Sequence, residues 1–374
     1  MKTKILMHKD VETAIVLQSE NNIKIKEIVN KEHLPVGVYN DNQILMNKLA
    51  AIWSNDRIIP NDRQNLDAII NRLGTTVSDA YVKSLGVSLT DCYWFKEENS
   101  KLRWSDVNFY DNGFEDKDFS LKNNFLHPDL TTNGTLEKTW KSIDNIAYLL
   151  KKEKRNILTV NEAVVSDIAG YVGISCTPYK ICNVNNELWS ICPSIITDNS
   201  MEMVSVLQIR HENMSNTMYG LKFLNDNFQK EFKDMLLLHT LTHNTDGHER
   251  NIAVIRNADT LEYNGFAPAF DNGTCLGSYR IDEDGNISSI IHKTNEMKDM
   301  FSNRDEILDY IGNDIVNYNL PSFAELNIIL KKYYENYNIP EDIYHIAEEE
   351  LKDGYNAIIQ RQLEIRRKEQ EWER

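Results

Sequence analysis

The chain has 374 residues, of which 41% are hydrophobic and 26% charged, and its formal net charge is −16 at pH 7. This composition is ordinary for a globular protein, and the length predicts two or three domains or subdomains. Because the chain is acidic and has no stripe of Lys and Arg interleaved with aromatic residues, we expect no direct binding to nucleic acid.

The cysteines and the apolar runs indicate in which cellular compartment the protein is expected. Five cysteines are scattered without a C-x-x-C pair, which argues against a disulfide framework and a Cys-rich zinc site. No apolar run approaches the roughly 18–20 residues that span a bilayer, so we expect no membrane association. The first residues are basic but lack the apolar stretch of a signal peptide. Together these features predict a cytoplasmic protein.

Residues 1–125 predict an N-terminal α/β module. Apolar residues first alternate with polar ones, as in strands, and then recur at helical spacing. The expected strands are Thr13–Leu17, Ile23–Val29 and Leu34–Tyr39, and the expected helices are Gln43–Asn55 and Gln64–Leu73. Between the two helices, Arg57 and Arg63 flank an Ile-Ile-Pro segment, which we interpret as a packed corner without chemistry.

The remainder changes gradually from strand to helix patterns. A glycine-containing loop at Thr131–Trp140 comes first, followed by mixed elements and then by long helical stretches. The expected strands are Ala147–Leu150, Leu188–Ile196, Ile252–Ile255 and Gly265–Phe270, and the expected helices are Glu162–Val172, Phe228–His243, Pro321–Lys331 and Glu341–Arg374. This order predicts an α+β fold with a two-lobed body.

Two polar segments carry the pattern of a phosphoryl-transfer site. Asp246 precedes Asn251 by five residues, and Asp271 opens an Asp-Asn-Gly triplet that ends at Gly273. In protein kinases a carboxylate orients the attacking hydroxyl, an Asn five residues later holds a metal ion, and an Asp-Phe-Gly triplet supplies the second metal ligand. By spacing alone, a structural interpretation is as open as a kinase site: Asp246 and Asn251 would then belong to a polar turn after a helix, and Asp271 to a hairpin turn.

The amino-acid sequences of these segments resemble those of the HipA-like (toxin-type) Ser/Thr protein kinases. Thr245-Asp246-Gly247-His248-x-x-Asn251 is similar to their catalytic loop, and Pro268-Ala269-Phe270-Asp271 to their metal-binding strand end. Other matches, in chain order, are Thr90–Lys96, Trp104–Tyr110, Thr131–Lys138, Tyr148–Lys151 and Asn161–Glu162. The first two resemble stand-alone members of the family found in Firmicutes. The resemblance runs from about residue 88 to about residue 280.

This resemblance implies a two-lobed protein-kinase-like fold with a β-rich N-terminal part and a mainly helical C-terminal lobe. Residues 126–200 would form an N-lobe-like region with the phosphate loop and the ATP lysine, and residues 201–374 the helical C-lobe. The implied cofactors are ATP and Mg²⁺. Asp246 would orient the substrate hydroxyl and accept its proton, while Asn251 and Asp271 would hold the metal ion, as oxygen ligands suited to Mg²⁺.

The resemblance also implies roles for residues around the nucleotide. Lys151 would bridge the α- and β-phosphates, with Glu162 as its ion-pair partner. Gly134 and Lys138 would form the loop that covers the phosphates, and Thr131 is the candidate for autophosphorylation there. Cys192 lies where the interlobe hinge should contact adenine through its backbone. His248 would brace the catalytic loop by hydrogen bonds rather than transfer a proton.

The chain departs from the family pattern at three places. Asn272 replaces the phenylalanine of the Asp-Phe-Gly triplet, so an aromatic switch cannot be assumed there. His239 stands just before the catalytic loop, where many relatives have Asp. Residues 1–87 match only faintly the module that meets an antitoxin in the fuller toxin members.

The predicted function is ATP- and Mg²⁺-dependent phosphoryl transfer to Ser/Thr of a protein substrate of unknown identity. A toxin kinase with an antitoxin-like partner is one form of this function. The alternatives are a pseudokinase or regulatory binding protein, and a small-molecule kinase on the same fold. A metal hydrolase is a further rival, because His239, His243 and His248 show H-x3-H and H-x4-H spacing, although no H-E-x-x-H motif is present.

Overall fold

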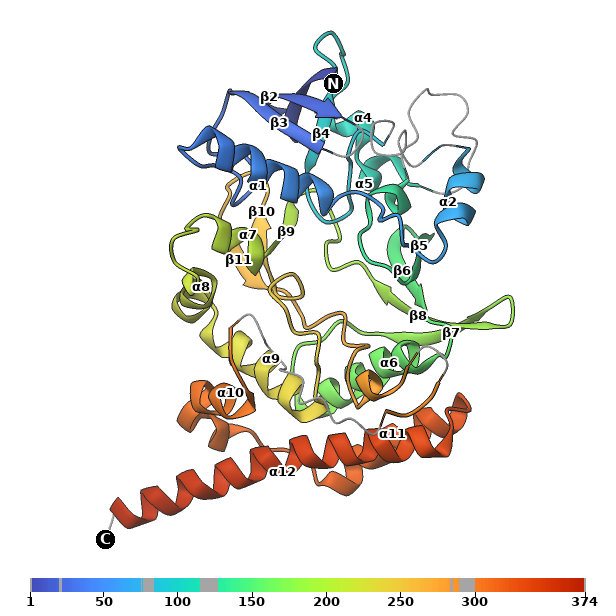
Figure 1. The fold of residues 1–374 in the computed structure, drawn as a ribbon, viewed down its shortest axis with the longest axis vertical. Helices are drawn as coiled ribbons and strands as arrows, with labels where there is room; N and C mark the ends of the chain where they lie inside the picture. Colours follow the sequence, from blue (N-terminus) through green and yellow to red (C-terminus); the bar gives the residue numbers. More distant parts are fainter. Residues whose placement is uncertain are drawn as a thin grey trace. The chain divides into compact units, whose positions relative to one another are not determined.

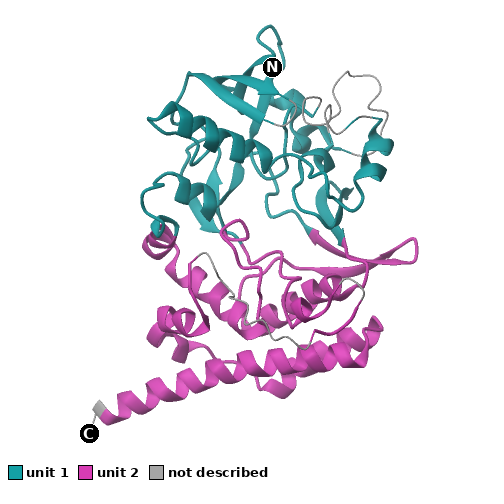
Figure 2. Ribbon diagram, in the orientation of Figure 1, with its two compact units in different colours: residues 1–151, 193–220, 253–267 teal, residues 152–192, 221–252, 268–374 magenta. Residues whose placement is uncertain are grey.

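The computed structural model describes residues 2–19, 22–74, 76, 84–114, 127–282, 285–288 and 300–372. These residues form two compact units, each made of three chain segments (Figure 2). Unit 1 consists of Met1–Lys151, Pro193–Gly220 and Ala253–Ala267, and unit 2 consists of Lys152–Cys192, Leu221–Ile252 and Pro268–Arg374. The domain boundary expected at residues 125–126 lies outside the described residues.

Unit 1 begins with an antiparallel sheet of strand order β3-β2-β1-β4. Its strands are β1 (Lys2–His8), β2 (Val11–Ser19), β3 (Asn22–Ile28) and β4 (Tyr93–Lys96). Helix α1 (Gln43–Asn55) packs against β3 (Figure 1). The side chain of Asn42 accepts hydrogen bonds from the first backbone N–H groups of α1, which explains why the helix begins where the sequence predicts.

The strand expected at Leu34–Tyr39 is absent, because these residues form turns. Leu34, Val36 and Val38 are all buried, so the alternating pattern that suggested a strand reflects packing rather than pairing. Gly37 has a left-handed φ of 75°, and a Cβ there would overlap the backbone of Gln208. This conformation interrupts any strand at the middle of the segment.

Further elements complete unit 1. They are α2 (Leu66–Leu73), α4 (Trp104–Val107), α5 (Phe109–Asn112), the 3-10 turn η2 (Pro128–Thr131), β5 (Glu137–Ile143), β6 (Ile146–Lys152), β9 (Met201–Ser205), α7 (Val206–His211), β10 (Ala253–Asn257) and β11 (Tyr263–Phe266). Strands β11, β10 and β9 form a three-stranded antiparallel sheet. The segment Thr131–Trp140, expected to be a loop, starts in η2 and becomes strand β5 from Glu137 onward.

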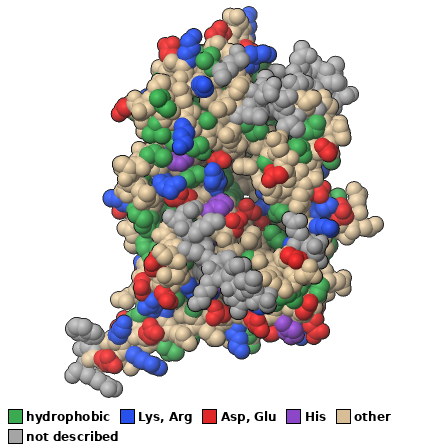
Figure 3. All heavy atoms as spheres, in the orientation of Figure 1, with side chains coloured by type: hydrophobic (Ala, Val, Ile, Leu, Met, Phe, Trp, Pro, Cys, Tyr) green, Lys and Arg blue, Asp and Glu red, His purple; other side chains and the backbone are tan. Residues whose placement is uncertain are grey.

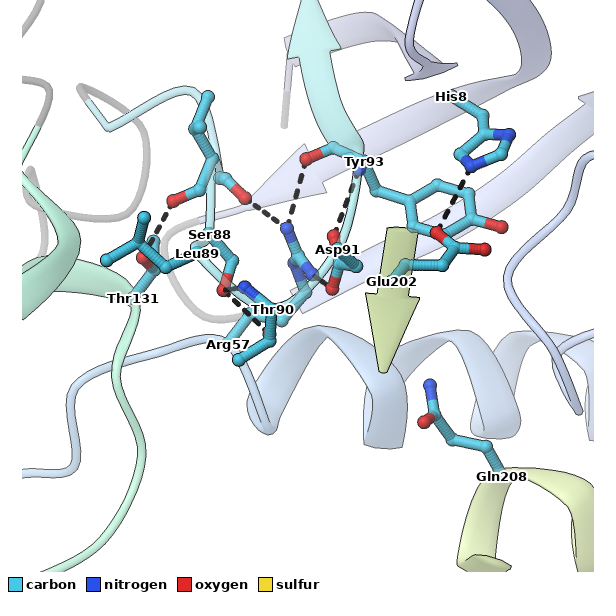
Figure 4. A network of polar contacts seen from close by, with 12 residues as sticks. His8, Arg57, Ser88, Leu89, Thr90, Asp91, Tyr93, Thr131, Glu202 and Gln208 are labelled. Atoms are coloured by element: carbon cyan, nitrogen blue, oxygen red, sulfur yellow. Dashed lines mark hydrogen bonds and ion pairs between the residues drawn. The ribbon is translucent and has the colours of Figure 1, made fainter. Parts of the chain in front are cut away.

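A buried polar network anchors the segment before β4 (Figure 4). The Arg57 guanidinium donates to the Asp91 carboxylate and to the backbone carbonyls of Gly86 and Tyr93. The hydroxyl of Thr131 donates to the carbonyl of Val87 at 2.7 Å. Two side chains from distant parts of the sequence therefore satisfy the carbonyls of one irregular segment, as buried backbone groups require.

Unit 2 is mainly helical. Its elements are α6 (Ile157–Val172), β7 (Lys180–Val184), β8 (Glu187–Pro193), α8 (Tyr219–Asn227), α9 (Gln229–Thr242), η3 (Ser278–Arg280), α10 (Arg304–Ile311), η4 (Gly312–Asn317), α11 (Phe323–Asn336) and α12 (Glu341–Trp372). Helix α12 packs along α9 and α11, and α11 packs on α6. At Gly354 a Cβ would overlap the carbonyl oxygen of Thr240, so glycine allows α12 to cross α9 closely.

The fold is α+β, with its sheets in the N-terminal part and its helices in the C-terminal part, as predicted. Among the described residues, none of the helices combines the length and the apolar character needed to cross a membrane. On the face drawn in Figure 3, Lys and Arg side chains are dispersed among acidic and apolar ones.

Candidate functional site

Helix α9 immediately precedes the predicted catalytic loop of unit 2. The helix ends at Thr242, and His243 follows in the left-handed region with φ of 49°. The backbone N–H of Asn244 donates to the carbonyl of His239 at 3.0 Å, which closes the last turn. The loop of residues 244–251 therefore starts from a fixed point.

Within this loop, hydrogen bonds bring Asp246 and Asn251 together. The backbone N–H of Asp246 donates to Oδ1 of Asn244 at 2.9 Å. The side-chain amide nitrogen of Asn251 donates to the carbonyl of Asp246, also at 2.9 Å. That bond uses the amide nitrogen of Asn251 and not its amide oxygen.

The predicted metal segment, residues 271–275, is bonded directly to the catalytic loop. The backbone N–H of Thr245 donates to the carbonyl of Thr274, and Nδ2 of Asn244 donates to Oδ1 of Asn272, both at 3.0 Å. Asn272 is fully buried, so this amide pair lies in the interior of unit 2. The structure therefore places Asp271 close to the loop that carries Asp246.

Asp271 has a left-handed φ of 58°, an unfavourable backbone conformation for a residue with a Cβ. Its backbone N–H points to the hydroxyl of Tyr179 at 3.4 Å. Such strained residues are found disproportionately at functional sites, where the surroundings hold them in place. The strain at Asp271 is consistent with a position fixed for chemistry rather than for local stability.

Helix α6 also holds the metal segment, through hydrogen bonds made by two of its side chains. The Glu162 carboxylate accepts a hydrogen bond from the backbone N–H of Asn272 at 2.9 Å. The Asn161 amide donates to the carbonyls of Gly273 and Cys275 at 3.1 and 3.0 Å. At Gly273 a Cβ would lie 3.0 Å from the carbonyl oxygen of Leu158, so a larger residue would push this segment away from α6.

The sequence placed Asn161–Glu162 at the start of this helix, whereas α6 begins at Ile157 and both residues lie in its second turn. The predicted start was late because the apolar spacing used to find the helix becomes regular only after Glu162. Lys151, the expected partner of Glu162, is buried at the last position of unit 1. Cys192 is buried on β8 at the end of a segment of unit 2.

The three histidines considered as zinc ligands have separate environments. His239 is buried, and burial lowers its pKa to about 4. His243 pairs with the carboxylate of Glu350, and Nε2 of His248 lies 3.7 Å from Oδ1 of Asp246. Within the described ranges, no three His, Cys, Asp or Glu side chains gather as a metal site.

The predicted phosphate loop lies in unit 1, as a turn of residues 132–138. Gly134 has φ of 100°, and a Cβ there would overlap the Lys138 ammonium, so the turn depends on glycine. Nζ of Lys138 donates to the carbonyl of Asn133 at 3.3 Å. The glycine and the lysine four residues later are therefore in close contact, while their role as a phosphate loop stays a prediction.

Thr131 precedes this turn and is buried in η2. Its hydroxyl donates to the carbonyl of Val87, and more weakly to that of Pro128 at 3.3 Å. A phosphoryl donor would reach this hydroxyl only after η2 opened. The structure thus sets a condition on autophosphorylation at Thr131, which stays a prediction.

Sequence reasoning missed the residues that hold the site together. Asn244, Asn161 and Asn272 form the links between the loop, α6 and the metal segment. Asn161 was named only with Glu162 as the start of a helix, and Asn272 only as a departure from Asp-Phe-Gly. A buried asparagine resembles an exposed turn asparagine in sequence, so the available signal was their position next to Asp246, Glu162 and Asp271.

No protein-family model matches this chain, and no curated protein matches it. Among solved structures, it is similar to the Shewanella oneidensis MR-1 toxin–antitoxin system HipA, HipB and its operator DNA complex, with a TM-score of 0.51 and 13% identity. That match covers 95% of this chain and 97% of the other. The proinflammatory kinase CtkA of Helicobacter pylori matches with a TM-score of 0.45 and 16% identity, over 61% of this chain and 94% of that one. The chain therefore has the kinase-like fold of HipA over nearly its full length, as its motifs predicted.

Proposed function

We propose that this chain is a protein kinase that transfers the γ-phosphoryl group of ATP to Ser/Thr of a protein substrate in the presence of Mg²⁺. The observation that carries the proposal is the bonding of the Asp246–Asn251 loop to the Asp271 segment within unit 2. Asp246 and Asn251, five residues apart, are thereby linked to the segment that begins at Asp271, twenty residues further on. The HipA fold supports the same conclusion.

The residues present suit a magnesium ion. Asn251 and Asp271 offer an amide oxygen and a carboxylate, which are the hard ligands that Mg²⁺ takes, and the nucleotide's phosphates would complete its shell. The hydrogen bond from Nδ2 of Asn251 to the Asp246 carbonyl orients the amide so that its oxygen is available to a cation. When bound, the metal ion would neutralise charge on the β- and γ-phosphates.

The remaining chemistry belongs to side chains of the chain itself. Asp246 would orient the acceptor hydroxyl and receive its proton, from a loop fixed by Asn244. Glu162 holds the backbone N–H next to Asp271 and so keeps the metal segment against α6. Lys138 and Lys151 would contact the phosphates from unit 1, and the backbone near Cys192 would contact adenine.

The test is a phosphorylation assay on the purified protein with ATP and Mg²⁺, read by mass spectrometry of the products. We expect phosphate on Ser or Thr residues of the protein itself or of proteins in an added host-cell extract. Asp246→Ala should lose this transfer almost completely. Asp226→Ala is the matched control, because its exposed carboxylate forms a surface i,i+4 pair with Lys222 at 2.5 Å. Wild-type protein that binds ATP with Mg²⁺ but transfers nothing would point to a pseudokinase.

The acceptor class and the biological role need separate experiments. Transfer to small molecules but not to protein would favour the small-molecule alternative. A toxin role with an antitoxin-like partner is supported only by the HipA likeness. Growth arrest on expression of the wild type but not of Asp246→Ala would support it, and equal growth in both strains would contradict it.

A further inference from the structure

The segment that links α1 to α2 carries two buried arginines, Arg57 and Arg63, to which no function has been given so far. Arg57 has a carboxylate partner in Asp91 and also donates to two backbone carbonyls (Figure 4). Arg57 thus has a structural role that accounts for its burial. Arg63 has no comparable set of partners.

Arg63 is only 3% exposed, and one nitrogen of its guanidinium, Nη2, donates to the backbone carbonyl of Thr132. Its Nε and Nη1 atoms are buried without a hydrogen-bond partner among the residues that the structure describes. Burying the donors of a cation without acceptors is costly, so such a group calls for an explanation.

Neighbouring carboxylates do not supply the missing acceptors. Oxygens of the Asp129 carboxylate accept from Arg72, Thr139 and the backbone N–H of Trp140 at 2.5 to 2.9 Å. Burial lowers the pKa of Arg63 to about 10, although Asp129 and Asp62 raise it. The group is still a cation at pH 7, and it lacks an anion in contact.

The guanidinium lies against the turn of residues 132–138. Arg63 donates to the carbonyl of Thr132, and Lys138 donates to the next carbonyl along the chain, that of Asn133. The adjacent linker residues bind the same turn, through Gln64 N–H to the carbonyl of Thr135 at 2.9 Å and through the Asn65 amide to that of Lys138 at 3.1 Å. Two cations therefore hold neighbouring carbonyls of one glycine turn.

We propose that Arg63 is an anion-binding residue of this turn and that, with Lys138, it contacts the phosphate groups of the bound nucleotide. A phosphate oxygen would supply the acceptor that the guanidinium lacks, in a charge-assisted hydrogen bond suited to arginine, once the packing over the buried Nε and Nη1 atoms has opened. The missing side chain of Gly134 leaves room for the Lys138 ammonium, which a Cβ there would overlap, so the turn keeps this second cation beside its backbone. The phosphate assignment rests on the proposed function, whereas the anion site rests on Arg63 itself.

The experiment measures binding of inorganic tripolyphosphate by calorimetry, in EDTA, to the full chain and its variants. We expect Arg63→Met to bind at least tenfold more weakly than the wild type, and Arg63→Lys to lie between them, because lysine keeps the charge without the planar fork. Arg103→Met removes an exposed arginine of the same unit and should bind as the wild type does. Equal affinity of the wild type and Arg63→Met would overturn the proposal.

A second measurement does not depend on the folding of the variants. In wild-type protein, tripolyphosphate should slow hydrogen exchange at the backbone amides of residues 132–138, and unchanged exchange there would also overturn the proposal. Transfer assays separate this inference from the proposed function. If the wild type transfers phosphate but the affinity for tripolyphosphate is the same in Arg63→Met as in the wild type, only the inference fails. If affinity depends on Arg63 but no ATP is used, the anion site stands and the kinase proposal fails.

Discussion

In unit 2, residues 244–251 and 271–275 are joined by the side-chain amides of Asn244 and Asn272 and by the backbone pair of Thr245 and Thr274, both at 3.0 Å. In unit 1, the turn of residues 132–138 is held by side chains that donate to its carbonyls, and two nitrogens of one of these, Arg63, have no partner within the described part of the chain. The first region is joined by bonds between its own residues, although the buried Nδ1 of His248 has no hydrogen-bond partner among the described residues. The second leaves positive charge unsatisfied.

This difference separates two ways of preparing a site. A network of direct hydrogen bonds positions its carboxylates before any ligand arrives, and the residue after Asp271, Asn272, is held by Glu162. A turn with an under-coordinated cation gains hydrogen bonds only when an anion binds. We therefore expect mutations in the unit 2 region to affect the chemical step and those in the turn to affect nucleotide affinity.

The largest expected effect comes from removing the carboxylate of Asp271. Asp271→Ala should reduce the rate of phosphoryl transfer on the order of 10²-fold or more, because a contact made in the transition state is lost. It should also abolish the extra rise in melting temperature that Mg²⁺ adds to ATP, since a ligand stabilises the native state it binds.

Asp246→Ala is the informative companion to that variant. It should lose transfer yet retain the Mg²⁺-dependent rise, because Asp246 is assigned to the acceptor and not to the metal ion. Near-normal transfer by Asp271→Ala, or a Mg²⁺ effect that survives in it, would show that the metal ion is bound elsewhere.

A smaller effect should come from acid, through His239 beside Asn272. The folded-state pKa of about 4 lies below the unfolded value of about 6.5, so the unfolded state binds more protons between these values. The free energy of unfolding should therefore fall as the pH is lowered through this window. At pH 5 this group alone should cost about 2 kcal/mol relative to pH 7.5.

Urea unfolding at the two pH values measures this cost. His239→Gln should reduce the difference by about that amount, while His345→Gln, which alters a histidine with a 58% exposed side chain, should not. An unchanged pH dependence in His239→Gln would mean that another group is responsible for the acid sensitivity.

The smallest effect is expected in the turn. Gly134→Ala imposes a side chain at φ of 100° and against Lys138, and should weaken ATP binding about tenfold while transfer at saturating ATP changes little. Gly113→Ala is matched to it, with φ of 67° and no described atom within 4 Å of the added Cβ. A loss of transfer rate rather than affinity in Gly134→Ala would reverse the comparison.

The sequence predicted regular elements best where local and tertiary forces agree. Helix α1 has the bounds expected from its apolar spacing, because the Asn42 cap fixes its first turn. The segment Leu34–Tyr39 misled the analysis, since its alternating burial arises in a turn whose shape depends on Gln208, far away in the sequence. Local patterns contain no information about such a distant neighbour.

The candidate site divides in the same way. The spacing of Asp246, Asn251 and Asp271 identified one loop and one strand end, which the structure then places together. Arg63 was interpreted as part of a packed corner, because a sequence does not reveal which donors of a buried guanidinium lack acceptors. That property emerges only from the atoms around it.

The interleaving of the two units has a consequence for how the chain is made. Strand β9 at Met201–Ser205 pairs with β10 at Ala253–Asn257. The three-stranded sheet of β9, β10 and β11 therefore cannot form until the ribosome has released residues beyond β11. By then the first segment of unit 2, Lys152–Cys192, is already outside, while α12, which packs on α9, is still to come. Folding through such distant pairings is slow, and a nascent chain stalled after β9 but before β10 has left the ribosome would expose the unpaired edge of β9.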